Sequence, residues 1–338
     1  MSADLTTRPV PPAAAQPAQR GRPWPMLAVL LFGQFMALLD VYIVNVAMPT
    51  IGVDLHASGS ALQLVIGGYT VAYAMLLITG ARLGTMYGRR RMYLVGVLGF
   101  TTSSLVCGLA PNVAVLIVFR FAQGASAAVL VPQIISVIQL RFTGKARAKA
   151  LSVYTALLAV GSLVGLVLGG VLVSASLFGL GWRPVFMVNV PIGLLLAVLV
   201  PRLVPADRPT GARRLDLAGL AVAVPAVLLV VLPLVLGHDL GWPAWTFGCV
   251  VAGLALAVLF VAVERRVAAR GRDPLLNLAV LRAPGMASGL VALSCAMIPY
   301  GGFVFVFALH LQSGLGDGAL RAALTLMPFG ATFGLVAY

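Results

Sequence analysis

The stretch MLAVLLFGQFMALLDVYIVNVAMPT, residues Met26–Thr50, shows what class of chain this is. It carries one charged side chain, Asp40, and about 20 mostly apolar residues are enough for a helix to cross a bilayer. Similar stretches recur through the 338 residues, of which 61% are hydrophobic and 9% charged, and the mean hydropathy is +1.04. Soluble domains contain about 25% charged residues. The composition therefore excludes a soluble globular or disordered protein and predicts an all-α polytopic membrane protein.

Turn residues and charge clusters divide the chain into ten predicted membrane helices. Their expected ranges are 26–50, 61–81, 92–110, 113–140, 150–174, 184–201, 216–236, 244–263, 285–311 and 320–338. A membrane β-barrel is set aside, because its strands would be segments of about ten residues that alternate apolar and polar side chains. Residues 1–25 hold six prolines and no apolar run, so we expect a disordered cytoplasmic tail and not a signal peptide.

The placement of the basic residues predicts the orientation of the chain. With the N-terminus in the cytoplasm, 20 of the 23 Lys and Arg residues fall in the inner segments. The positive-inside rule describes this asymmetry, and it indicates a multi-pass protein of the plasma (inner) membrane. The net charge of +14 then reflects topology, and we expect no nucleic-acid partner. Three cysteines in apolar runs are typical of small core residues and indicate neither a disulfide nor a metal site.

Two ionisable residues, Asp40 and Arg120, lie well inside predicted helices, where each is costly to insert. At 1.5 Å per residue, they lie about 16 Å and about 12 Å from the outer ends of their helices, so we expect them to pair. Gln123 shares the face of Arg120 one turn later. A buried structural ion pair is one interpretation. The other is a proton-coupling switch, because a carboxylate in a low dielectric readily takes a proton unless a guanidinium keeps it ionised.

Other residues are candidates for packing or for contact with a substrate. Gly161, Gly165, Gly169 and Gly170 form a stripe of small residues that would let two helices approach closely. Met36 lies one turn before Asp40, and Tyr69 offers a ring face to a cation. Helix packing explains each of these features as well. The candidate lining of a substrate cavity is Met36, Asn45, Tyr69 and Gln123.

Taken in order, the motifs of the chain resemble those of the major facilitator superfamily and, within it, the 14-helix drug:proton antiporters. The matching stretches are LDVYIVNVAMP at Leu39–Pro49, GARLGTMYGRRR at Gly80–Arg91, RFAQG at Arg120–Gly124, GSLVGLVLGG at Gly161–Gly170 and WRPVFMVNVPIG at Trp182–Gly193. The positions that carry conformational or packing roles in these motifs include Gly80, Gly84, Gly88, Arg89, Arg90, Asn189 and Pro191, together with the four glycines of the stripe.

This resemblance implies proton-coupled export of small lipophilic compounds, cations among them, by alternating access. Asp40 and Arg120 would couple protons, and the proton gradient would supply the energy without a cofactor or metal. We expect a monomer whose partners are the lipid bilayer, protons and a small-molecule substrate. The sequence departs from the family pattern at Thr85 and Met86, which replace an acidic and a basic residue, and at Leu166, which replaces a proline of the antiporter motif.

The resemblance also implies a division of the chain. We expect an N-terminal six-helix bundle at 26–204, a linker with two extra membrane helices at 205–282, and an incomplete C-terminal bundle at 283–338. The chain would then be a truncated form of a 14-helix protein. Alternatives are a proton-linked metabolite transporter of the same fold and a non-transporting membrane fragment. An enzyme is not expected, because His56, His238 and His310 lie far apart and match no catalytic motif.

Overall fold

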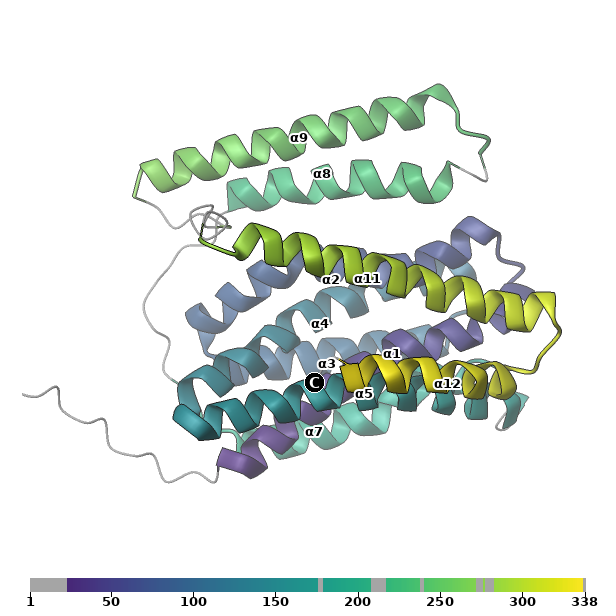
Figure 1. Cartoon of the computed structure of the whole chain (residues 1–338), viewed down its shortest axis with the longest axis horizontal. Helices are drawn as coiled ribbons and strands as arrows, with labels where there is room; N and C mark the ends of the chain where they lie inside the picture. The colour runs from purple at the N-terminus through teal and green to yellow at the C-terminus, as the bar shows by residue number, and fades with distance from the viewer. Residues whose placement is uncertain are drawn as a thin grey trace, which may run out of the picture.

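The computed structural model describes residues 23–175, 179–207, 217–237, 240–271, 276 and 283–336, and every regular element among them is helical (Figure 1). The first seven helices are α1 (Pro23–Asp54), α2 (Gly59–Tyr87), α3 (Arg89–Gly108), α4 (Val113–Arg141), α5 (Gly144–Ala175), α6 (Pro184–Met187) and α7 (Asn189–Leu203). They are followed by α8 (Leu217–Leu236), α9 (Ala244–Ala269), α11 (Met286–Leu309), the π-helical turn η2 (His310–Gly314) and α12 (Ala319–Val336). The all-α prediction is confirmed.

The ten predicted spans coincide with helices, and the span 184–201 covers α6 and α7 together. Within the described residues, seven helices are long and apolar enough to cross a membrane, with α6 and α7 counted as one. The predicted span 92–110 corresponds to α3, which begins with Arg89–Arg91 and carries a polar run at Thr101–Ser104. The predicted spans 285–311 and 320–338 correspond to α11 with η2 and to α12. Residues 216, 337 and 338, at the ends of predicted spans, lie outside the described residues.

The start of α1 differs from the expectation that residues 1–25 form a disordered tail. Residues 1–22 lie outside the described residues, but Pro23 and Pro25 belong to the first turn of α1. Proline is tolerated there because the N–H groups of a first turn have no partner within the helix. Elsewhere side chains cap the helices: Ser58 accepts from the Ala61 N–H (3.2 Å) and Asn112 accepts from the Val115 N–H (3.0 Å).

Helices α1 to α7 pack into one bundle with α1 at its centre, because buried residues follow α1 from Met26 to Ile51. Two apolar clusters fill the bundle. One contains Met36, Tyr69 and Tyr93, and the other contains Leu39, Ile43 and Trp182. Asp40 therefore lies where the two clusters meet.

The remaining helices pack on the outside of this bundle. The α8–α9 hairpin lies beside α2, and α12 lies along α5 (Figure 1). Their outer faces are apolar: Val258 of α9 is 72% exposed and Ile298 of α11 is 74% exposed. Such surfaces are expected in lipid, where apolar side chains carry no cost of contact with water. The domain boundaries at residues 204 and 282 stay a prediction.

Candidate functional site

The centre of the bundle holds Asp40 and Arg120 in direct contact. The Arg120 Nη1 atom lies 2.5 Å from Asp40 Oδ2, and the two side chains are 1% and 0% exposed. The structure thus brings together the two charges that share a depth in the predicted helices. Because taking both charges out of water is costly, such a pair is stable only if further hydrogen bonds satisfy the remaining polar atoms.

Gln123 and Asn189 supply those hydrogen bonds to the pair, and Ser104 in turn accepts from both. Gln123 Nε2 donates to Asp40 Oδ1 (2.8 Å), and Gln123 Oε1 accepts from Arg120 Nη1 (2.8 Å). Asn189 Nδ2 donates to Asp40 Oδ1 and to Ser104 Oγ, both at 3.0 Å. We call Asp40, Ser104, Arg120, Gln123 and Asn189 the buried polar cluster. The cluster joins α1, α3, α4 and α7, so a change in the charge of Asp40 would alter hydrogen bonds between these four helices.

Sequence reasoning missed Ser104 and gave Asn189 only a packing role. Ser104 Oγ accepts from Gln123 Nε2 (3.2 Å) and donates to the Phe186 carbonyl (2.9 Å). The polar run Thr101–Ser104 inside an apolar segment was the signal that could have indicated Ser104. Asn189 is the first residue of α7 and is 0% exposed.

An aromatic layer covers the guanidinium of Arg120. Its Cζ atom lies 4.6 Å from the Tyr69 ring centroid and 5.8 Å from that of Phe186, and its Nε donates to the Val65 carbonyl (2.8 Å). The cation that Tyr69 faces is therefore Arg120 of the protein itself. The assignment of Tyr69 to a substrate cavity stays a prediction.

The other three cavity candidates, Met36, Gln123 and Asn45, are buried or half-buried in this conformation. Met36 and Gln123 have no exposed surface, so in this conformation neither side chain lines a cavity that a substrate can enter. Asn45 is half-buried, and its amide donates to the Val41 carbonyl of its own helix (2.7 Å). The physical reason is shared: α1 is the central helix, and most of its side chains are covered by its neighbours.

The glycine stripe of α5 packs against the part of α1 that carries Asp40. A Cβ atom added at Gly165 would lie 2.9 Å from the Tyr42 Cβ, and one at Gly169 would lie 3.0 Å from the Ile43 carbonyl oxygen. Gly161 faces Leu38, and Gly170 is buried. These contacts support the packing interpretation. Leu166, next to Gly165, packs in an apolar cluster that α5 shares with Val46 of α1 and with α12.

The predicted loop motif joins α2, α3 and the end of α7. Gly80 packs against the Ala128 carbonyl of α4, Gly84 packs against the Gln133 side chain, and Gly88 has a φ of +94°, which favours glycine. Arg89 Nη1 and the Arg89 N–H both contact Asp207 Oδ2, at 3.1 and 2.9 Å.

Asp207 also accepts from the Arg90 N–H (3.2 Å), and Arg90 Nη1 donates to the Val204 carbonyl (3.2 Å). Sequence reasoning missed Asp207, which caps α3 from 118 residues away. Pro191, in the first turn of α7, has no N–H for the Met187 carbonyl, which helps to separate α6 from α7.

A second acidic residue of α1 was also missed. At the end of the helix, Asp54 Oδ2 accepts from Trp182 Nε1 and from Arg183 Nη1, both at 2.9 Å. The Arg183 and Asp54 side chains are 28% and 45% exposed, so this pair is accessible to solvent.

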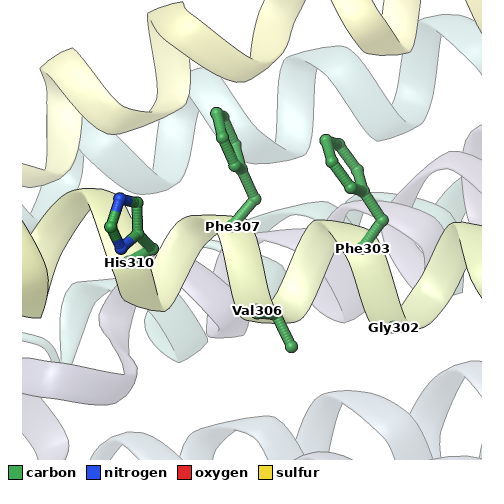
Figure 2. Close-up of a pocket in the computed structure, with 5 residues that line it drawn as sticks. All are labelled: Gly302, Phe303, Val306, Phe307 and His310. Carbon is green, nitrogen blue, oxygen red and sulfur yellow. The ribbon is translucent and has the colours of Figure 1, made fainter.

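A pocket of about 360 Å³ lies against α11 and the start of η2, and its lining residues are Gly302, Phe303, Val306, Phe307 and His310. Phe303, Phe307 and His310 project to one side of the helix and Val306 to the other (Figure 2). The ring centroids of Phe303 and Phe307 are 5.2 Å apart, and those of Phe303 and Phe329 are 4.6 Å apart. Phe307 also packs against the apolar cluster that includes Val46 of α1. The pocket is therefore mainly aromatic and adjoins the bundle.

Among the residues that the structure describes, no group of three metal-binding side chains lies close together.

Two known proteins with similar sequences are named as a transporter and as an export protein. The chain is 40% identical over 316 residues to the Probable actinorhodin transporter of Streptomyces coelicolor, covering 94% of this chain and 55% of that protein. It is 37% identical over 306 residues to the Cephamycin export protein CmcT of Amycolatopsis lactamdurans, covering 89% of this chain and 62% of that protein. The chain thus spans little more than half the length of these relatives.

The fold is also that of known transporters. The proton:xylose symporter XylE bound to 6-bromo-6-deoxy-D-glucose aligns with a TM-score of 0.59 at 15% identity, over 93% of this chain and 68% of that chain. The family model of the Major Facilitator Superfamily matches residues 30–338. With the helical bundle, the ordered motifs and these relatives in agreement, the chain belongs to the Major Facilitator Superfamily.

Proposed function

We propose that the complete protein exports small lipophilic compounds, cations among them, across the plasma (inner) membrane by alternating access. The N-terminus would lie in the cytoplasm, the protein would act as a monomer, and protons entering through Asp40 would supply the energy without a cofactor. The buried polar cluster carries this proposal, because it places a carboxylate that can take a proton at the junction of four helices. No catalytic chemistry is proposed.

Protonation of Asp40 would change the balance of charge inside the bundle. In the ionised form, the carboxylate neutralises Arg120 at 2.5 Å and accepts hydrogen bonds from Gln123 and Asn189. In the protonated form, Arg120 would be a buried cation without a counter-charge, which is strongly unfavourable in a low dielectric. The helices would then rearrange until Arg120 finds water or another partner. Transporters of this kind rock one bundle against the other around a central site.

The relatives and the aromatic pocket support the choice of substrate class. The two relatives reported above are named for the transport of actinorhodin and the export of cephamycin. The pocket against α11 presents stacked rings and one imidazole, which suits a lipophilic compound with a flat or cationic part. We propose that substrate enters here, beside α1 and α12.

Replacement of the proton-binding carboxylate tests the proposal. The complete coding sequence is expressed in cells that lack other exporters, and ethidium efflux is followed with and without a proton uncoupler. We expect Asp40→Asn to lose uncoupler-sensitive efflux while still inserting into the membrane, because a neutral amide costs less to bury than a carboxylate. Asp54→Asn removes a carboxylate from the same helix outside the cluster and serves as the control. Undiminished, uncoupler-sensitive efflux by Asp40→Asn would refute proton coupling through Asp40.

A proton-linked transporter of a metabolite is the second candidate function, because the proton:xylose symporter shares the fold. The direction of flux separates the two. An exporter lowers the ethidium content of energised cells, whereas a symporter that accepts ethidium would raise it.

A further inference from the structure

Asn189 differs from the other members of the buried polar cluster in having an unused hydrogen-bonding atom. Its Nδ2 donates to Asp40 Oδ1 and Ser104 Oγ, but its Oδ1 has no hydrogen-bond partner although it is buried. Buried acceptors without a partner are uncommon and costly. The atom is therefore an acceptor that the observed arrangement of the cluster does not use.

The chemistry of Asp40 indicates which donor the unused Asn189 Oδ1 could accept from. An ionised carboxylate only accepts hydrogen bonds, and Arg120, Gln123 and Asn189 all donate to it. Once protonated, Asp40 would carry an O–H donor that needs an acceptor. Gln123 Oε1 already accepts from Arg120 Nη1. Asn189 Oδ1 is the amide oxygen of the described cluster that accepts no hydrogen bond.

A half-turn of the Asn189 amide exchanges its Oδ1 and Nδ2 with almost no change of shape. The observed orientation offers a donor to Asp40 and fits the ionised carboxylate. The reversed orientation would offer an acceptor and fit the protonated acid, and it would place Nδ2 at the position that has no partner. Each orientation thus matches one protonation state.

We propose that Asn189 is a positioning residue that responds to the proton on Asp40 by turning its amide, an inference that rests on the proposed proton coupling. A hydronium ion of the aqueous phase transfers its proton to Asp40 Oδ1, which forms an O–H bond and releases water. The O–H then donates to Asn189 Oδ1. Arg120 keeps its charge, so the cluster changes from neutral to a net charge of +1.

The turn would be transmitted to the α6–α7 junction. Ser104 Oγ accepts from Asn189 Nδ2 and donates to the Phe186 carbonyl at 2.9 Å. After the turn, Asn189 Oδ1 faces Ser104, so the Ser104 hydroxyl swings toward it and leaves the Phe186 carbonyl. Phe186 lies two residues before the helix interruption at Val188. The proton would therefore weaken a contact that holds this junction.

The other ionisable groups around Asp40 do not compete with it for the proton. Besides Arg120 of α4, those that interact with it electrostatically are Tyr69 of α2 and Cys107 of α3. An ordinary phenol or thiol titrates at much higher pH than an ordinary carboxyl. On α5 the facing residues are Gly165 and Gly169, and α6 contributes Phe186. Helices α11 and α12 meet α1 near Val46, and the ionisable residues near that contact are His310, Asp317 and Arg321.

Infrared spectroscopy of the purified full chain during a pH titration tests the inference. The carboxyl band of protonated Asp40 is the one that Asp40→Asn removes. We expect Asn189→Leu to move that band to higher wavenumber, because the O–H loses its acceptor. Gln133→Met is the matched control: Gln133 is also a buried amide with an unpartnered oxygen, but its Nε2 donates to backbone carbonyls of Gly80 and Val129. In this control the band should stay at its wild-type position.

An Asp40 band that stays at its wild-type position in Asn189→Leu would overturn the inference, because the protonated acid would then make no hydrogen bond to Asn189. So would the absence of any Asp40 carboxyl band. The wild-type protein shows whether Asn189 accepts from the protonated acid or only donates to it, and this measurement remains possible if Asn189→Leu does not fold. An asparagine amide band should move to lower wavenumber together with the appearance of the Asp40 band, and its failure to move would overturn the inference.

The infrared measurement needs no transport. Failure of the wild-type protein to export ethidium would therefore refute the proposed function and leave the amide result standing.

Discussion

Helix α1 carries two aspartates that each pair with an arginine from a later part of the chain, in different surroundings. Asp40 is 0% exposed and contacts Arg120, whereas Asp54 is 45% exposed and contacts Arg183. In water a salt bridge competes with solvation, so an exposed pair contributes about 0–1 kcal/mol. In the centre of the bundle no water replaces a lost partner. An Asp–Arg pair is therefore a minor surface contact at the end of α1, where it is Asp54 with Arg183. In the middle of α1, where it is Asp40 with Arg120, loss of one partner would be strongly destabilising.

A third pair, Arg89 with Asp207, is intermediate. Its side chains are 12% and 18% exposed, and the carboxylate also accepts from two backbone N–H groups at the start of α3. The three pairs form a series in which exposure falls and the number of additional hydrogen bonds rises. The series predicts the order of the mutational effects.

The largest effect is expected from Arg120→Ala. Removing one partner of a buried pair leaves the other charge uncompensated, which costs about 3–5 kcal/mol. Thermal and denaturant unfolding in detergent, together with ethidium efflux, would measure the loss. Arg120→Lys keeps the charge and should recover part of the stability but not the contact of Nε with the Val65 carbonyl. A stable Arg120→Ala variant would mean that Asp40 takes a proton when Arg120 is absent, so that no uncompensated charge remains.

An intermediate effect is expected from Asp207→Asn, which removes the charge but keeps one acceptor oxygen for the start of α3. Weakening charged hydrogen bonds at a partly exposed site should cost about 1–2 kcal/mol. The same unfolding measurements apply, with Asp317→Asn as the control, because Asp317 pairs within its own turn with an Arg321 side chain that is 80% exposed. Equal effects of the two substitutions would contradict the series.

The smallest effect is expected from Arg183→Ala. Asp54 keeps its hydrogen bond from Trp182 Nε1 and remains in contact with solvent, so we expect a change of about 0–1 kcal/mol. Measuring the variant at low and high salt sharpens the comparison, since salt screens an exposed pair far more than a buried one. A loss as large as that of Arg120→Ala would mean that exposure does not set the rank order.

Much of the fold was predictable because it depends on local composition. Apolar length locates the helices, and the charges between them mark the turns. Depth along a helix also predicts that Asp40 and Arg120 can meet. The interruption at Val188 and the helical start at Pro23 were not predicted, because an apolar run does not reveal where a helix is locally broken or where it gains its first turn.

The site was predicted only in part. Gln123 follows Arg120 by three residues, so one helix face reveals it, but Asn189 lies 149 residues from Asp40 and Asp207 lies 118 residues from Arg89. Met36 and Tyr69 were assigned to a cavity because their chemistry suits one. Packing places both in the apolar core, with Tyr69 against Arg120.

The sequence by itself determined the helical class, the similar depth of Asp40 and Arg120 along their helices and the family, since each of these follows from residue type and spacing along one axis. Only the tertiary structure decided which atoms meet. A helix can turn about its axis and exchange neighbours without any change in its hydropathy. The closure of four helices around Asp40, and the unpartnered oxygen of Asn189, therefore arise from packing in three dimensions.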